Sequence, residues 1–260
     1  MATLLDALDT IPPDSERTFE INMDKVADSV PGEPRPDFYY TSTTQQSQFA
    51  CAACNGFNDV RGRFAYCSQC GSRNNAANLT SALASVRQRI NSRELAPAEA
   101  VKQSISEFDS AGRDYVAKLC ARIPMTGKRR TQGQRILFHN VGAVNEFLKN
   151  AFDIDMLQGL TDKLDFIRMM FHRRHVYEHD GGVASARYVQ ESGDPEGREG
   201  VLIRESVENA HKLLGLLERM AKNLDDGFHE IFPPERFCID IEVARRARMP
   251  SSGRSDTERP

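Results

Sequence analysis

From residue 79 onward, apolar residues recur every three or four positions, which is the spacing of helices with one buried face. The pattern is clearest over 96–123, where Pro97 and Pro124 set the two ends because proline is tolerated only in a first helical turn. The apolar positions of this segment are Val101, Ile105, Phe108, Tyr115, Leu119 and Ile123. Similar patterns predict helices at 79–95 (capped by Thr80 or Ser81), 136–152, 155–180 and 206–228. The chain is therefore predicted to be mainly α, with a C-terminal antiparallel helical bundle over residues 79–232.

The remaining segments lack this periodicity. Residues 1–48 are an acidic segment with five prolines, predicted to act as a linker. Residues 124–135 are predicted to form a basic loop, and residues 183–200 an irregular stretch with turn signals. Residues 245–260 hold five arginines and are predicted to be a basic disordered tail.

Charge and targeting signals narrow the possible classes of protein. The net charge of −3 is not that of a protein that coats nucleic acid. Residues 1–50 hold nine acids and three bases, a net charge of −6, so the other 210 residues carry +3. The N-terminus lacks the basic and apolar regions of a secretory signal, and no apolar run approaches the roughly 20 residues that cross a bilayer. These features predict a cytoplasmic protein without a membrane partner.

Four of the six cysteines form two C-x-x-C pairs: Cys51 and Cys54, then Cys67 and Cys70 after twelve residues. Four thiolates at this spacing are typical of a closed tetrahedral zinc site. The spacing predicts a zinc ribbon at residues 49–75 with one structural Zn²⁺ per chain, which would also supply the folding energy of so small a module. A redox C-x-x-C pair is the alternative, but no thioredoxin-like βαβ pattern accompanies it. Whether the ribbon binds nucleic acid or a protein partner is left open by its residues.

The most unusual stretch is "FHRRHVYEHDGG", residues 171–182. On a helix of about 100° per residue, His172, His175 and His179 fall within a sector of roughly 60°. The apolar residues Phe166, Met169, Met170 and Tyr177 lie broadly on the other side. The histidines are therefore predicted to face water or a partner chain, and a polar helix face without a task is the simplest interpretation.

A zinc peptidase is one functional interpretation. "HVYEH" matches the pattern H-x-x-E-H, in which His175 and His179 would bind zinc and Glu178 would act as the base. A catalytic zinc needs a third protein ligand, and a helical body of this size does not resemble such peptidases.

The stretch "RHVYEH", Arg174 to His179, resembles instead the Arg…His motif of HEPN domains, all-helical modules of which some are ribonucleases. A polar residue commonly follows that arginine, and His175 takes this place here. The likeness covers about half of the chain, residues 95–228, and "RRHVYEHDGG" and "ARYVQESGD" are its most specific parts. It implies a HEPN-like bundle and a metal-independent endoribonuclease in a toxin or phage-defence setting. Some HEPN toxins are silenced at a tyrosine two residues after the histidine, where this chain has Gly181.

The chemistry of RNA cleavage explains these residue types. A histidine can transfer protons near neutral pH, and an arginine can hold phosphoryl oxygens as charge develops on them. We expect His179 to transfer the proton, Arg174 to stabilise the phosphate, and His175 or Glu178 to orient them, without a catalytic cofactor. Because Arg174 and His179 diverge by about 140° on an ideal helix, the hypothesis needs a homodimer, as the resemblance implies.

Residues that would bind the RNA are expected in the basic segment: Lys128, Arg129, Arg130 and Arg135. Ordinary solubility explains such a cluster equally well. The main alternative to a nuclease is a non-catalytic adaptor, in which the ribbon and the bundle bind RNA or a protein partner.

Overall fold

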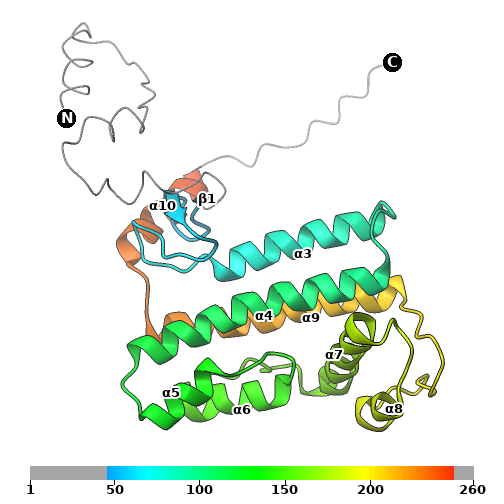
Figure 1. Ribbon diagram of the computed structural model, residues 1–260. Helices are drawn as coiled ribbons and strands as arrows, with labels where there is room; N and C mark the ends of the chain where they lie inside the picture. The colour runs from blue at the N-terminus through cyan, green and yellow to red at the C-terminus, as the bar shows by residue number, and fades with distance from the viewer. Residues whose placement is uncertain (1–45, 249–260) are drawn as a thin grey trace, which may run out of the picture. The chain divides into compact units, whose positions relative to one another are not determined.

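The computed structural model describes residues 46–248, and this part of the chain is mainly helical (Figure 1). The expectations for residues 1–45 and 249–260 lie outside it. The chain divides into two compact units. One comprises Phe49–Asn58 and Phe64–Pro260, and thus the cysteines and all helices of the described residues. The other contributes only residues 46–48 and 59–63 to the described part.

Two short strands, β1 (Gln46–Ala50) and β2 (Phe57–Arg61), pair in a two-stranded sheet and precede the helices. The helices are α3 (Asn75–Asn91), α4 (Pro97–Arg122), α5 (Gly127–Gln134), α6 (Val141–Phe152), α7 (Leu164–His179), α8 (Ala186–Ser192), α9 (Val207–Ile231) and α10 (Arg236–Arg248), with a 3₁₀ turn, η3 (Thr161–Lys163), before α7.

The long helices α3, α4 and α9 lie side by side (Figure 1). A short turn reverses the chain between α3 and α4, which makes these two antiparallel as predicted. The prediction is wrong for α4 and α9, which run in the same direction. The reason is that α5 to α8 carry the chain back to the end at which α4 began, before α9 starts.

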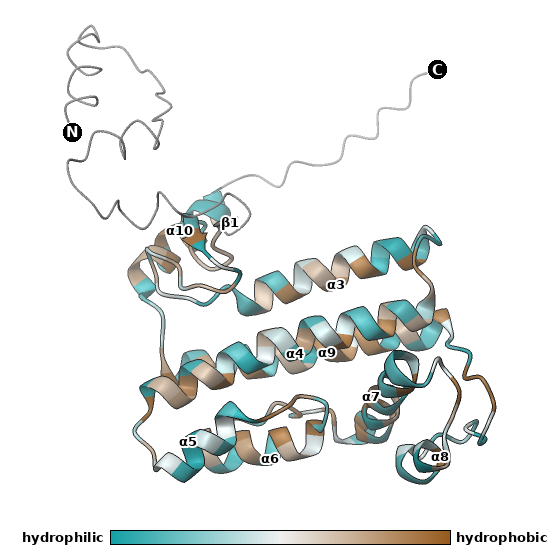
Figure 2. Cartoon of the chain, viewed as in Figure 1, coloured by the Kyte–Doolittle hydropathy of each residue, from teal (hydrophilic) through white to brown (hydrophobic). Residues whose placement is uncertain are grey.

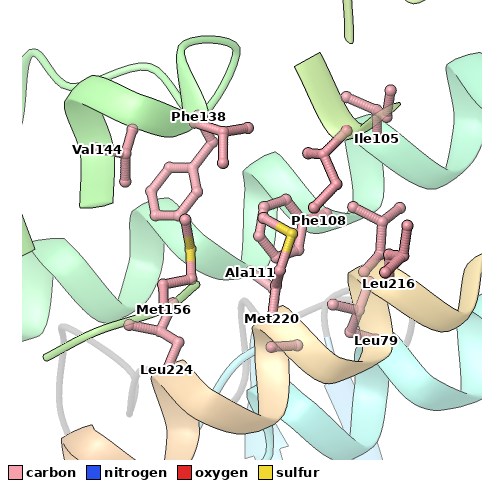
Figure 3. Packing of buried hydrophobic residues seen from close by; sticks show 14 of the residues in the cluster. Leu79, Ile105, Phe108, Ala111, Phe138, Val144, Met156, Leu216, Met220 and Leu224 are labelled. Atoms are coloured by element: carbon pink, nitrogen blue, oxygen red, sulfur yellow. The ribbon is translucent and has the colours of Figure 1, made fainter. Parts of the chain in front are cut away.

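The predicted apolar face of α4 is confirmed, since Val101, Ile105, Phe108, Tyr115 and Leu119 are each at most 1% exposed. Phe108 lies at the centre of the packing, with its ring edge-on to Phe138 at 5.6 Å and to Phe171 of α7 at 6.4 Å between centroids. Figure 3 shows Ile105, Phe108 and Ala111 of α4 packed beside apolar residues of α9, and Figure 2 shows apolar and polar residues alternating along the helices. Burial of each such side chain contributes about 1.5–3 kcal/mol.

Several helix boundaries differ from the predicted ones. Helix α3 begins at Asn75, so neither Thr80 nor Ser81 caps it. The side chain of Asn75 is fully buried and donates to the Ala111 carbonyl oxygen of α4, which fixes this earlier turn. Helix α6 begins only at Val141, because the side chain of Asn140 accepts a hydrogen bond from the Ala143 amide and caps the helix there.

Three segments predicted without regular structure contain helices. The supposed basic loop at 124–135 holds α5, whose first turn is capped by Thr126 accepting from the Arg129 amide. The irregular stretch 183–200 holds α8, capped by Ser185. The first four residues of the predicted tail, 245–248, belong to α10. Helices α5 and α8 were missed because, at eight and seven residues, they are too short for an apolar period to be recognised. Helix α10 was missed because its buried residue is Glu242, so it has no buried apolar face. Within residues 46–248, no helix combines the length and apolar character that crossing a membrane requires.

Candidate metal centre and histidine site

The four cysteines predicted to bind metal converge in one buried cluster. The Sγ atoms of Cys51 and Cys70 lie 3.7 Å apart and those of Cys54 and Cys67 3.6 Å apart, and all four lie within 4.8 Å of one another. Tetrahedral ligands at the zinc–sulfur distance of about 2.3 Å would be about 3.8 Å apart. The cluster can therefore hold one metal ion, and its dimensions fit Zn²⁺.

The two C-x-x-C turns have the same hydrogen bonds. The Cys51 amide donates to the Gly56 carbonyl and the Cys67 amide to the Ser72 carbonyl, at 2.9 and 2.7 Å. The residue after each second cysteine has a left-handed backbone, namely Asn55 with φ 58° and Gly71 with φ 74°. These turns point amide groups at sulfur. Although burial alone would raise the pKa of Cys67, amides of Cys70 and Gln69 and the Asn58 side chain lower it to about 6. Burial raises the pKa of Cys51 and Cys54, so in the absence of a metal the first deprotonation of the cluster is favoured at Cys67.

The cysteine cluster is joined to the helical body by hydrogen bonds of its second turn. The Glu235 amide donates to the Cys70 carbonyl at 2.7 Å, and the Arg73 amide donates to Nε2 of His229 in α9 at 3.0 Å. Arg73 itself is buried, with its guanidinium bonded to Asp114 and Asn75. It is therefore part of the interior and not of a basic surface that could face nucleic acid.

The histidine stretch forms α7 and ends as its sequence predicts. The helix stops at His179, and Gly181 and Gly182 follow with φ 59° and 85°, a conformation that glycine adopts without strain. His175, Glu178 and His179 are exposed, while Met169, Met170 and Tyr177 are buried. The prediction that the histidines lie off the core face is confirmed for His175 and His179, whereas His172 is half-buried.

Two adjacent arginines of α7 have different environments. Arg173 is 3% exposed and forms ion pairs with Asp194 at 2.8 Å and with Glu205 at 3.0 Å. Tyr188 and Tyr177 donate their hydroxyls to the same two carboxylates. This network connects the segment after α7 to the helix, and Arg173 therefore has a structural role.

Arg174, by contrast, forms no ion pair with any carboxylate of the described residues. Its side chain is half-buried, and its Nε atom is buried without a hydrogen-bond partner. A buried guanidinium nitrogen without a partner is costly, so an anion near this side chain would be stabilised.

The rings of His175 and His179 lie 4.7 Å apart, centroid to centroid, on the exposed side of α7. His175 also lines a cavity of about 550 Å³ between α7, α8 and the start of α6, whereas Glu178 and His179 do not. The residues of this cavity with a titratable or charged side chain are His139, Arg168, His172, His175, Asp180, Arg187, Tyr188 and Glu191.

Two histidines of the cavity are kept neutral by their surroundings. Partial burial lowers the pKa of His139, and the charge of Arg174 lowers it further against the opposing effect of Asp109. Partial burial also lowers the pKa of His172, helped by His175 and Arg187 and opposed by Glu191. Both imidazoles are therefore unprotonated at neutral pH and able to accept a proton.

The basic residues expected to bind RNA are exposed, but on a different part of the surface. Lys128, Arg129 and Arg130 lie on α5 and Arg135 directly follows it, and none of the four lines the cavity.

The zinc-peptidase interpretation requires a third protein ligand beside His175 and His179, and the described residues do not supply one. Among the described residues, only the four cysteines bring three or more potential metal-ligand atoms together.

No signal in the sequence indicated His139 and Arg187 as members of the site. Arg168 falls in the same helical sector as the three histidines at about 100° per residue, and it lines the cavity with His172 and His175. Comparison with protein-family models, with curated proteins and with solved structures yields no match to this chain. Any function must therefore be argued from the residues and their geometry.

Proposed function

We propose that this chain is a metal-independent endoribonuclease of the HEPN type, with Arg174 and His179 as its principal catalytic residues. The observation that supports it most is the difference in ion pairing between the two adjacent arginines. Arg173 forms ion pairs with two buried carboxylates, whereas Arg174, the arginine of the motif, has no carboxylate partner among the described residues. A structural helix face would give no reason to leave this second guanidinium unpaired.

The proposed reaction uses the RNA as its own nucleophile. The 2′-hydroxyl oxygen forms a bond to the adjacent phosphorus, the bond from phosphorus to the 5′-oxygen breaks, and a 2′,3′-cyclic phosphate remains. A neutral histidine accepts the 2′-hydroxyl proton and a protonated histidine donates one to the leaving 5′-oxygen. Arg174 stabilises the charge that develops on the phosphoryl oxygens. The rings of His175 and His179 are close enough for the two histidines to exchange these roles. Glu178, exposed between them on α7, is the residue we propose to orient them.

The active form in this proposal is a homodimer. Arg174 and His179 point to different sides of a regular helix, since α7 remains helical up to His179. A second protomer would bring its own motif to the exposed end of α7, so that the arginine of one chain serves the histidine of the other.

The cysteine cluster is proposed to be a zinc ribbon with one structural Zn²⁺. All four ligand positions are occupied by buried thiols, so no position is open for a substrate or a reactive water. The zinc would stabilise the turns that are bonded to α9 and to the residue before α10, and it has no part in the cleavage itself.

The decisive test is cleavage of RNA in EDTA by wild type and by Arg174→Ala and His179→Ala, with the zinc content measured to show that the cysteines keep their metal. Arg204→Ala and His211→Ala are matched controls outside the motif. We expect each motif variant to lose at least 100-fold of its rate, as removal of a proton-transfer or charge-stabilising group does. Both controls should cleave like wild type.

The dimer is tested by mixing the two inactive variants. If the motifs of two chains form one site, heterodimers of Arg174→Ala and His179→Ala regain part of the activity. RNA that stays intact with wild type across several substrate classes would contradict the nuclease. The exposed motif would then be an interaction surface, as in the adaptor alternative.

A further inference from the structure

The cavity beside α7 has features that the proposed cleavage by Arg174 and His179 does not explain. It is walled by three chain segments: the turn before α6, the exposed side of α7, and α8. The turn before α6 contributes His139, α7 contributes Arg168 and His172, and α8 contributes Arg187. Residues that are distant in sequence thus direct potential hydrogen-bond donors into a space of about 550 Å³.

Arg168 is the cation of this cavity without a carboxylate partner among the described residues. It is exposed and forms no ion pair with a carboxylate of residues 46–248. Its guanidinium reaches from α7 to the first turn of α6, where Nη2 lies 3.4 Å from the place that a Cβ on Gly142 would take. The guanidinium therefore lies against the first turn of α6 at ordinary van der Waals distance.

Arg187 on the opposite wall is held by a weak pair. It bonds Glu191 one turn along α8 at 3.0 Å, and both side chains are largely exposed, at 80% and 46%. Such a pair contributes about 0.3–0.5 kcal/mol, so a stronger anion can displace the glutamate at little cost. A phosphate is such an anion, because it accepts two parallel hydrogen bonds from a guanidinium.

The formal charges of the cavity limit the size of the anion that it can hold. Arg168 and Arg187 are opposed by Glu191 and Asp180, so the walls are close to neutral while the histidines are unprotonated. Binding one phosphate would displace Glu191 and favour protonation of His172 and His139. This balance suits a single phosphate group and not a long polyanion.

We propose that this cavity is a phosphate-binding subsite, which holds the phosphate next to the one that is cut in an RNA strand. His175 connects the two places, because it lines the cavity and its ring lies 4.7 Å from that of His179 at the exposed end of α7. The inference rests on the proposed function in naming RNA as the source of the phosphate and in placing it next to the phosphate that is cut.

The test is binding of a short 2′-O-methyl oligoribonucleotide, which lacks the attacking hydroxyl and cannot be cleaved, to the full chain at low salt. Arg168→Gln and Arg187→Gln should each weaken binding about tenfold, which corresponds to about 1.4 kcal/mol for a charged hydrogen bond at an exposed site. Glu191→Gln should strengthen binding, because it removes the competing carboxylate. Arg204→Gln is the matched control and should change nothing.

Weaker binding with Arg187→Gln and stronger binding with Glu191→Gln, one helical turn apart, cannot both arise from partial unfolding of α8. Affinity should also rise as the pH falls from 7.5 to 5.5, since protonated His172 and His139 favour the anion. The charges of Arg174 and Arg113 oppose protonation of His139, those of His175 and Arg187 oppose protonation of His172, and Asp109 and Glu191 promote it. His172→Gln should reduce this rise.

Unchanged affinity in the three cavity variants would overturn the subsite, even if Arg174→Ala abolishes cleavage. Inorganic phosphate that binds as tightly as the oligonucleotide would overturn RNA as the ligand and indicate a small phosphate compound. Oligonucleotide binding with the expected pattern, in a protein that cleaves no RNA, would leave the subsite standing and remove the proposed nuclease.

Discussion

Arg173→Met tests the separation of roles between the two adjacent arginines. Methionine fills much the same volume but removes a guanidinium that contacts Asp194 and Glu205 at 2.8–3.0 Å. The side chains of these carboxylates are 1% and 0% exposed. Two buried negative charges would be left without their cation.

Breaking a buried ion pair by removing one partner costs about 3–5 kcal/mol, because the remaining charge stays desolvated. For a protein of this size, 1 kcal/mol lowers Tm by about 2–4 °C, so the expected fall is about 6–20 °C. Urea unfolding followed by circular dichroism gives the free energy directly. Arg187→Gln, which breaks an exposed pair, is the control and should lose at most about 0.5 kcal/mol.

A second variant separates the lost pair from the uncompensated charges. Arg173→Met combined with Asp194→Asn and Glu205→Gln removes both carboxylate charges and should recover part of the stability. A loss below about 1 kcal/mol for Arg173→Met alone would refute the reasoning, since Arg173 would then be no more committed to structure than a surface arginine.

Three further predictions concern the metal centre, the core and the pH dependence. Cys70→Ser should lower the bound zinc to well below one ion per chain by atomic absorption and destabilise the end of α9, whereas Cys120→Ser, a buried cysteine outside the cluster, should keep the full zinc content. Gly112→Ala should lower the free energy of unfolding in urea by about 1–3 kcal/mol, because the new Cβ would lie only 2.4 Å from the Phe138 ring. Gly215→Ala in α9, where the new Cβ has open space, is the control and should raise the free energy of unfolding by up to about 1 kcal/mol. Burial opposes the ionised form of Asp194, but Tyr188, the Glu196 amide and Arg173 hold its pKa below the ordinary 3.8. The stability that depends on this carboxylate is therefore present above pH 3.8 and lost as the pH falls through the lowered pKa, so the difference between wild type and Asp194→Asn should shrink below about pH 4. An unchanged difference at pH 3 would contradict this.

Local signals in the sequence were sufficient for α4, α9 and the cysteine cluster, whereas the helix predicted over 155–180 begins only at Leu164. Helix α4 agrees with its predicted bounds to within one residue at each end, because Pro97 and Pro124 are physical limits of a helix. The start of α6 was misjudged because Ile136, Leu137 and Phe138 look like helical core residues. Phe138 instead packs against Gly112 of α4, a contact that no local pattern reveals.

The candidate site was predictable only in the part that one helix carries. The exposed placement of His175 and His179 follows from periodicity within α7. The sequence could not tell which of the two adjacent arginines is structural, because the partners of Arg173 lie 21 and 32 residues further along the chain. It could not show the cavity either, since His139 and Arg187 reach it from separate segments.

The measurement that tests the central claim most directly is the chemical identity of the RNA ends produced by wild type in EDTA. Attack by the 2′-hydroxyl should leave a 2′,3′-cyclic phosphate on one fragment and a 5′-hydroxyl on the other. These ends should be absent with Arg174→Ala and retained with Arg204→Ala. Intact RNA, or ends with a 3′-hydroxyl and a 5′-phosphate, would contradict cleavage by the RNA's own 2′-hydroxyl at this site.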